Sequence, residues 1–209
     1  MYRYETRKLN IQLVPKTAWY TNLRSVLLNW GSISAKVRSK GKCDICGKVF
    51  PASQLDAHEV WEYDDKTHTQ SLNNIICVCR DCHNAVHFGH AQVTGTDEEA
   101  LKQYMAVNNL SQEEAEEDIN EAFDVWRKRS EHEWHFDDDL FKKVKDITGT
   151  RPIEYSERPV NGRCYDRVPF EEKELAKKVG AKFDWENKLW YFRTDKERNR
   201  FREYLKENM

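Results

Sequence analysis

Two short stretches in the first half of the chain carry the apolar pattern of β-strands. Residues 54–61 (QLDAHEVW) alternate in polarity, and residues 72–79 (LNNIICVC) form a short run rich in isoleucine and valine. A polar stretch separates them, so we predict two strands joined by a loop. Alternation along the first strand places His58 and Glu59 on opposite faces, unless the strand is bulged.

Elsewhere the apolar positions recur every three or four residues, as they do on the buried side of a helix. Thr96 and Ser111 are each followed three residues later by a glutamate. This is the spacing of a capping box, so we predict that a helix begins at each of them. The other predicted helices cover residues 17–29, 32–40, 82–90, 170–179 and 195–207, and a further strand covers residues 8–14. The mixture predicts an α+β fold.

A stretch with several proline and glycine residues, 146–162, predicts a boundary between two domains. The expected first domain is residues 1–146, made of a basic arm (1–42), a core (43–95) and a helical hairpin (96–146). Residues 147–209 are expected to form a small accessory α+β module, with a hairpin turn at residues 186–188. Its aromatic residues are either its core or a surface that stacks on bases, namely Phe183, Trp185, Trp190 and Phe192. Binding of a protein partner is a further predicted role for this module.

Two C-x-x-C pairs frame the predicted strands: Cys43 with Cys46, and Cys79 with Cys82. Four thiolates are the complete tetrahedral shell of a structural zinc site. Cys77 also stands close to the second pair, but the C-x-x-C spacing favours the other four cysteines. We therefore expect Cys77 to be a small buried apolar residue.

Histidines at i and i+4 follow the second cysteine pair. His83 and His87 project from one face if residues 82–90 are helical. A zinc ion held by four cysteines leaves these imidazoles free, and such a pair suits a second, open metal site completed by a ligand from elsewhere in the chain. We therefore predict one metal ion that stabilises the fold and a second that takes part in chemistry.

This arrangement resembles the HNH, or ββα-metal, endonuclease family. His58 matches the family's first metal-binding position, Asn74 its central asparagine, and His83 and His87 its helical metal ligands. Both cysteine pairs also match, and the run from His58 to Trp61 is similar to one subgroup. The resemblance covers residues 8–145 and implies a ββα-metal core with a four-cysteine zinc knuckle and helical flanks.

The resemblance also implies a function. It predicts a divalent ion (Mg²⁺, Mn²⁺, Ni²⁺ or Zn²⁺) on His58, His83 and His87, which promotes hydrolysis of phosphodiester bonds. The expected substrate is DNA, with RNA as a less favoured alternative, and the expected source is a bacterium or its phage. Asn74 would orient the general base, with Asn73 as the alternative at that position.

One position departs from the family pattern. Glu59 stands where the family most often has its catalytic histidine. A carboxylate can take a proton from water, so Glu59 is the predicted base, and His58 is the alternative if Glu59 binds metal instead. Because of this departure, an alternative function is a catalytically silent, zinc-stabilised module that binds nucleic acid or protein. A ribonuclease is a third alternative.

Charge is distributed unevenly along the chain, although the net charge is only −2. Residues 1–48 contain ten basic and two acidic residues, whereas residues 97–146 contain seven basic and sixteen acidic ones. A basic arm suits a phosphate backbone. The predicted phosphate contacts are Arg24, Lys36, Arg38, Lys40 and Lys42. Apolar runs are too short for a membrane span, and cysteines in metal-type pairs suit a reducing compartment, so a cytoplasmic protein is expected.

Overall fold

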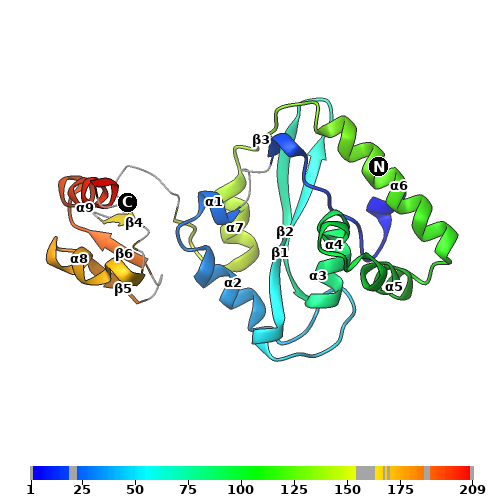
Figure 1. Cartoon of the computed structure of the whole chain (residues 1–209), viewed down its shortest axis with the longest axis horizontal. Helices are drawn as coiled ribbons and strands as arrows, with labels where there is room; N and C mark the ends of the chain where they lie inside the picture. Colours follow the sequence, from blue (N-terminus) through cyan, green and yellow to red (C-terminus); the bar gives the residue numbers. More distant parts are fainter. Residues whose placement is uncertain are drawn as a thin grey trace. The chain divides into compact units, whose positions relative to one another are not determined.

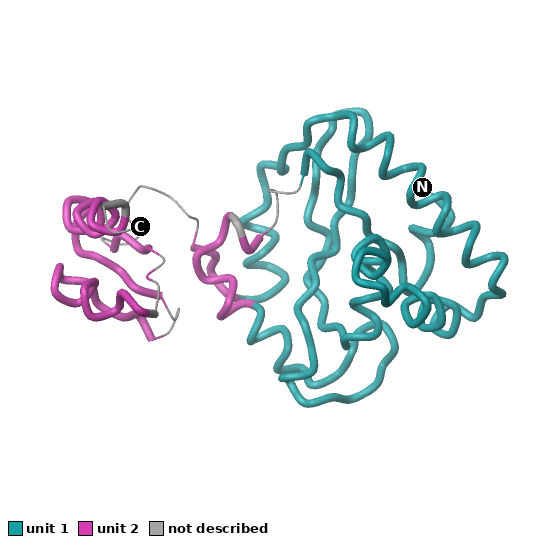
Figure 2. Tube along the Cα trace, in the orientation of Figure 1, with its two compact units in different colours: residues 1–22, 34–149 teal, residues 23–33, 150–209 magenta. Residues whose placement is uncertain are grey.

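The structure is a computed structural model of the 209-residue chain. It describes residues 2–18, 23–153, 163–166, 168, 170–185 and 189–207. The chain divides into two compact units (Figure 2). The first consists of Met1–Asn22 and Ser34–Gly149, and the second of Leu23–Ile33 and Thr150–Met209.

A long β-hairpin organises the first unit (Figure 1). Strands β1 (Leu55–Asp64) and β2 (Thr69–Cys79) are antiparallel, and the two-residue β3 (His135–Phe136) pairs in parallel with the start of β2. Both long strands extend beyond their predicted limits. The register shifts once, because Val60 lies opposite Asn74 whereas Trp61 lies opposite Leu72. Asn73 is therefore the extra residue of a β-bulge.

Helices cover the hairpin on two sides. In Figure 1, α7 (Leu140–Thr148) lies on one side of β1 and β2, with α3 (Arg80–Val86) and α4 (Phe88–Thr94) on the other. Helices therefore pack on both faces of the hairpin. His58 and Trp61 are three residues apart on β1 and so point to opposite faces, yet both are shielded from solvent. The remaining helical segments described between residues 4 and 129 are η1 (Tyr4–Thr6), η2 (Lys16–Ala18), α1 (Leu23–Val26), α2 (Trp30–Arg38), η3 (Ala52–Gln54), α5 (Asp97–Asn108) and α6 (Gln112–Arg129).

Three local predictions are wrong. Residues 8–14 form no strand, because their backbone bonds to side chains and to the end of α3 rather than to a neighbouring strand. The helix predicted at residues 82–90 breaks at His87, which separates α3 from α4. A helix, α5, does begin after Thr96 as predicted, but Thr96 does not cap it with its side chain, because the Thr96 hydroxyl bonds to Asn84 instead.

Other local predictions are confirmed. Ser111 and Glu114 form both hydrogen bonds of a capping box at the start of α6. The predicted helix at residues 32–40 exists as α2, displaced by two residues towards the N-terminus. The helix predicted at 17–29 is not confirmed. Its residues 19–22 lie outside the described part of the chain, and the described remainder contains only η2 and the single turn of α1.

The second unit contains a three-stranded antiparallel sheet in the order β4-β6-β5. Its elements are β4 (Cys164–Asp166), η4 (Phe170–Glu172), α8 (Lys173–Lys178), β5 (Lys182–Asp184), β6 (Leu189–Phe192) and α9 (Asp195–Glu207). Phe192 and Phe201 pack in its core, whereas Trp185 is 82% exposed. The predicted turn at residues 186–188 lies outside the described residues.

The second unit also includes Leu23–Ile33, which precedes the rest of this unit by more than a hundred residues in the chain. Asn29, only 1% exposed, donates from its side-chain amide to the Arg151 carbonyl and accepts from the Ile153 backbone N–H, at 2.9 Å each. Leu28 packs beside Ile153 and Tyr165.

These elements establish an α+β fold, as predicted. In the parts of the chain that the structure describes, the helices are too short or too polar to cross a membrane. The predicted division at residues 146/147 stays a prediction.

Candidate metal centres

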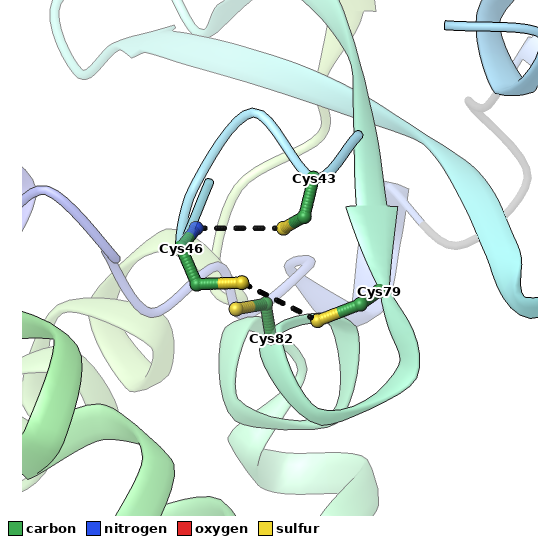
Figure 3. A group of neighbouring side chains, drawn as sticks. All are labelled: Cys43, Cys46, Cys79 and Cys82. Atoms are coloured by element: carbon green, nitrogen blue, oxygen red, sulfur yellow. Dashed lines mark hydrogen bonds between the residues drawn. The ribbon is translucent and has the colours of Figure 1, made fainter. Parts of the chain in front are cut away.

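Four cysteines converge at the base of the hairpin (Figure 3). Cys43 and Cys46 lie in a turn before β1, Cys79 ends β2 and Cys82 lies in α3. Their sulfur atoms all lie within 4.8 Å of one another, and those of Cys46 and Cys79 are 3.8 Å apart. Zinc–sulfur bonds of about 2.3 Å in a tetrahedron place the sulfurs about 3.8 Å apart, so this group is compatible with a structural zinc ion.

The backbone around Cys43 suits a thiolate. Burial raises the pKa of this thiol, but backbone N–H groups of Cys46, Cys79 and Ile45 together outweigh burial and lower the pKa to about 7. Burial dominates at the partners, raising the pKa of Cys79 to about 11 and that of Cys82 well above its ordinary value. The thiols of Cys79 and Cys82 would therefore lose their protons near neutral pH only beside a cation.

Side chains outside the group of four hold it in place. Gln103 of α5 donates from its amide to the Cys82 sulfur at 3.1 Å. Asp44, between the first two cysteines, bonds to the backbone of Cys77 through both its backbone N–H and its carboxylate. Cys77 itself is fully buried outside the group, so its prediction as a small core residue agrees with its position.

Three histidines form a second group. His58 lies on β1, His83 on α3, and His87 at the residue that ends α3. One ring nitrogen from each lies within 4.8 Å of the others, and the ring centroids are 4.9 to 5.3 Å apart. The sequence-based ligand set is thus brought together around one point, with room for an ion between the nitrogens.

The helix break does not separate the two helical histidines. The backbone N–H of His87 still donates to the His83 carbonyl at 3.1 Å, so the i, i+4 relation survives although α3 ends at Val86. His58 reaches the same point from the neighbouring strand, where it is 5% exposed. The hairpin and the helix that follows it therefore supply all three imidazoles.

Burial keeps two of these rings neutral near pH 7. Burial, followed by the charges of His87 and His83, holds the pKa of His58 well below its ordinary value. Burial likewise lowers the pKa of His87 to about 4, with smaller contributions from His83 and His90. A neutral imidazole has the free lone pair that a metal ligand needs.

Each of the three rings also has an outer hydrogen-bond partner. The Asp56 carboxylate lies 3.2 Å from Nδ1 of His83. Gln12 lies 3.2 Å from Nε2 of His58 through its side-chain oxygen, and its backbone bonds to His87. Metal-binding histidines characteristically donate their second ring N–H to a carboxylate or a carbonyl, so the donor set fits a divalent ion.

Sequence reasoning missed both of these partners. Asp56 had a signal, because it lies two residues before His58 on the same strand and hence on the same face. Gln12 had none, since it is far from the histidines in sequence and lies in a segment without regular secondary structure.

Glu59 and Asn74 stand apart from the three histidines. The Glu59 carboxylate accepts a hydrogen bond from the Trp61 indole at 3.0 Å, and it belongs to neither ligand group among the described residues. The bulge falls after Val60, so it does not turn Glu59 towards the face of His58. Asn74 is exposed, and its side-chain oxygen accepts from the N–H of Ile75.

The predicted phosphate contacts occupy different parts of the chain. Lys36, Lys40 and Lys42 are exposed along α2 and the turn that leads to the first cysteine pair. Lys40 is paired with Asp44 at 3.0 Å, and Arg38 donates to a backbone carbonyl of η3. Arg24 is exposed on α1, in the second unit.

An open pocket of about 900 Å³ borders the histidine group. His83 and His87 lie in its wall, with Arg80 on α3 and Lys102 on α5. Acidic groups including Asp56 also line it. An ion held by these histidines would be open to a ligand from solvent through the pocket, as catalytic metal sites are and closed structural sites are not.

The low pKa of His87 predicts a pH dependence of stability. Between about pH 6.5 and pH 4 the unfolded chain binds a proton at His87 that the folded chain excludes, so stability falls as the pH falls through this window. From pH 7.5 to 5.0 the loss due to His87 should be on the order of 1 to 2 kcal/mol. Urea unfolding without added metal should show a smaller loss in His87→Gln than in the wild type. Equal losses of stability in the wild type and in His87→Gln would contradict the attribution of this pH dependence to His87.

Comparison with protein families matches residues 163–206, which lie in the second unit, to a family model. The matching family is a domain of unknown function, DUF5710. No curated protein and no solved structure matches the chain.

Proposed function

We propose that the protein is a metal-dependent endonuclease of the HNH type, which hydrolyses phosphodiester bonds in DNA. The observation that carries the proposal is the convergence of His58, His83 and His87 beside an open pocket. The order of elements supports it, because a hairpin followed directly by a helix supplies the ligands. The four cysteines next to this site support the proposal of a structural zinc ion there.

In this proposal the three imidazoles would hold the divalent ion. When bound, the ion would stabilise the negative charge that develops at the scissile phosphate and the leaving oxygen. Asp56 holds the orientation of His83 through its hydrogen bond. Arg80 and Lys102 contribute positive charge to the pocket wall, where a phosphate backbone can contact them.

Two residues are candidates for the general base. Glu59 is the base by its place in the motif, and His58 is the alternative. Replacing Glu59 by glutamine keeps its shape but removes its basicity, so the rate of cleavage should fall by about 10² to 10⁴. Divalent-ion affinity should stay unchanged. Kinetics of plasmid cleavage, with calorimetry for the ion, would measure both, and a wild-type rate in this variant would transfer the role to His58.

A second candidate function follows from the position of Glu59. Its carboxylate is bonded to the Trp61 indole and lies outside the histidine group. A catalytically silent module that binds nucleic acid or protein through a zinc-stabilised fold would show the same arrangement.

Cleavage of a supercoiled plasmid separates these candidates. Pure protein with Mg²⁺, Mn²⁺ or Ni²⁺ should produce relaxed or linear DNA, and EDTA should prevent it. RNA of similar length, digested in parallel, would identify a ribonuclease. Folded, zinc-containing protein that cuts neither substrate with any of these ions would favour the silent module.

A further inference from the structure

We infer that Gln12 is a positioning residue of the histidine site, which holds His58 and the end of α3 in the arrangement that a divalent ion requires. The inference rests on the proposed function for the ion itself. It extends the site to a segment of the chain that lies more than forty residues before the first histidine.

Gln12 makes three contacts with the elements that carry the histidines. Its backbone N–H donates to the Val86 carbonyl, at the last residue of α3, at 2.8 Å. Its backbone carbonyl accepts a hydrogen bond from the His87 ring. Its side-chain oxygen lies 3.2 Å from Nε2 of His58. One residue therefore joins the strand and the helix that supply the ligands.

The side-chain contact determines which nitrogen of His58 is free. An amide oxygen only accepts hydrogen bonds, so Nε2 of His58 carries the hydrogen and Nδ1 carries the lone pair. Asp56 acts in the same way on His83, where the carboxylate faces Nδ1 and leaves Nε2 free. Partners of this kind fix the tautomer and the ring orientation of metal-binding histidines.

The segment around Gln12 is fixed on both sides. Leu9 and Ile11 are almost fully buried, and Asn108 at the end of α5 bonds to both the N–H and the carbonyl of Leu9. After Gln12, the carbonyl of Val14 accepts from the indole of Trp126 on α6 at 2.9 Å. A side chain carried on a fixed backbone can hold the ring of His58 without rearranging when an ion binds.

The test measures binding of Co²⁺, by calorimetry and by absorption, to the full chain carrying one equivalent of zinc, which the four cysteines retain after brief dialysis against a weak chelator. Cobalt on imidazoles lacks the thiolate charge-transfer bands of cobalt on cysteine, so the two sites are distinguished. Gln12→Ala should weaken Co²⁺ binding at the histidines about 10- to 100-fold. Gln12→Glu retains an acceptor oxygen and should bind within a few-fold of the wild type, or more tightly. Asn10→Ala, in the same segment, should bind as the wild type does.

Each other outcome overturns the inference in a recognisable way. Wild-type affinity in Gln12→Ala would overturn it while leaving the metal site intact. Equal losses in Gln12→Ala and Gln12→Glu, with matching losses in thermal stability, would assign Gln12 a merely structural role. Wild-type protein that binds no Co²⁺ outside the cysteines would overturn the proposed function together with the inference.

Discussion

Replacing Cys82 by serine should unfold the first unit at room temperature. Structural zinc sites contribute on the order of 10 kcal/mol or more to folding, whereas whole domains are stable by only about 5 to 15 kcal/mol. The four cysteines join the turn before β1, the end of β2 and α3. Of these, α3 also carries His83, and the turn leads into β1, which carries His58. Loss of one ligand should therefore remove the zinc ion and most of the unit's stability.

Zinc content and urea unfolding would measure this effect. Cys77→Ala is a matched control, because Cys77, on β2, is as fully buried as Cys82 but is not one of the four. It should lose only about 1 kcal/mol, the cost of a small cavity. If Cys82→Ser, stripped of zinc, unfolded at the same urea concentration as the wild type, the four cysteines would have no structural role.

Replacing His83 by alanine should abolish metal-dependent cleavage while the protein stays folded. This residue is partly exposed at the pocket, so its loss leaves little cavity in the core. Removing one of three protein ligands should release the ion and with it several kcal/mol of transition-state stabilisation. Each 1.36 kcal/mol corresponds to a tenfold change in rate, so we expect a loss of about 10³-fold or more.

The matched control is His132→Ala, which removes an exposed histidine that stacks on His68. Plasmid cleavage by this variant should equal that of the wild type, and both variants should retain the zinc ion expected at the four cysteines. Cleavage by His83→Ala at the wild-type rate would place the catalytic centre elsewhere in the molecule.

Ligand spacing is a local property of the sequence, and the two candidate sites could be predicted for that reason. A C-x-x-C pair converges two sulfurs within one turn, and an i, i+4 pair places two rings on one face regardless of the rest of the fold. Even the break at His87 left the relation to His83 intact, because the backbone hydrogen bond between them remains.

Long-range contacts could not be predicted in this way. KLNIQLV alternates like a strand, yet its backbone bonds to Asn108 and Val86, and nothing in the local pattern identifies those partners. The same applies to Gln12. Thr96 is a similar case. Its hydroxyl could form a hydrogen bond either with the first turn of α5 or with Asn84, and in the folded chain it bonds to Asn84.

The most direct test of the account is a crystal structure of the protein grown with zinc, with anomalous diffraction recorded above and below the zinc absorption edge. We expect two anomalous peaks in each chain, one among the four cysteine sulfurs and one among the imidazoles of His58, His83 and His87. A single peak at the cysteines, with the three imidazoles bonded only to water and protein, would contradict the central claim that the chain carries a second, catalytic metal site.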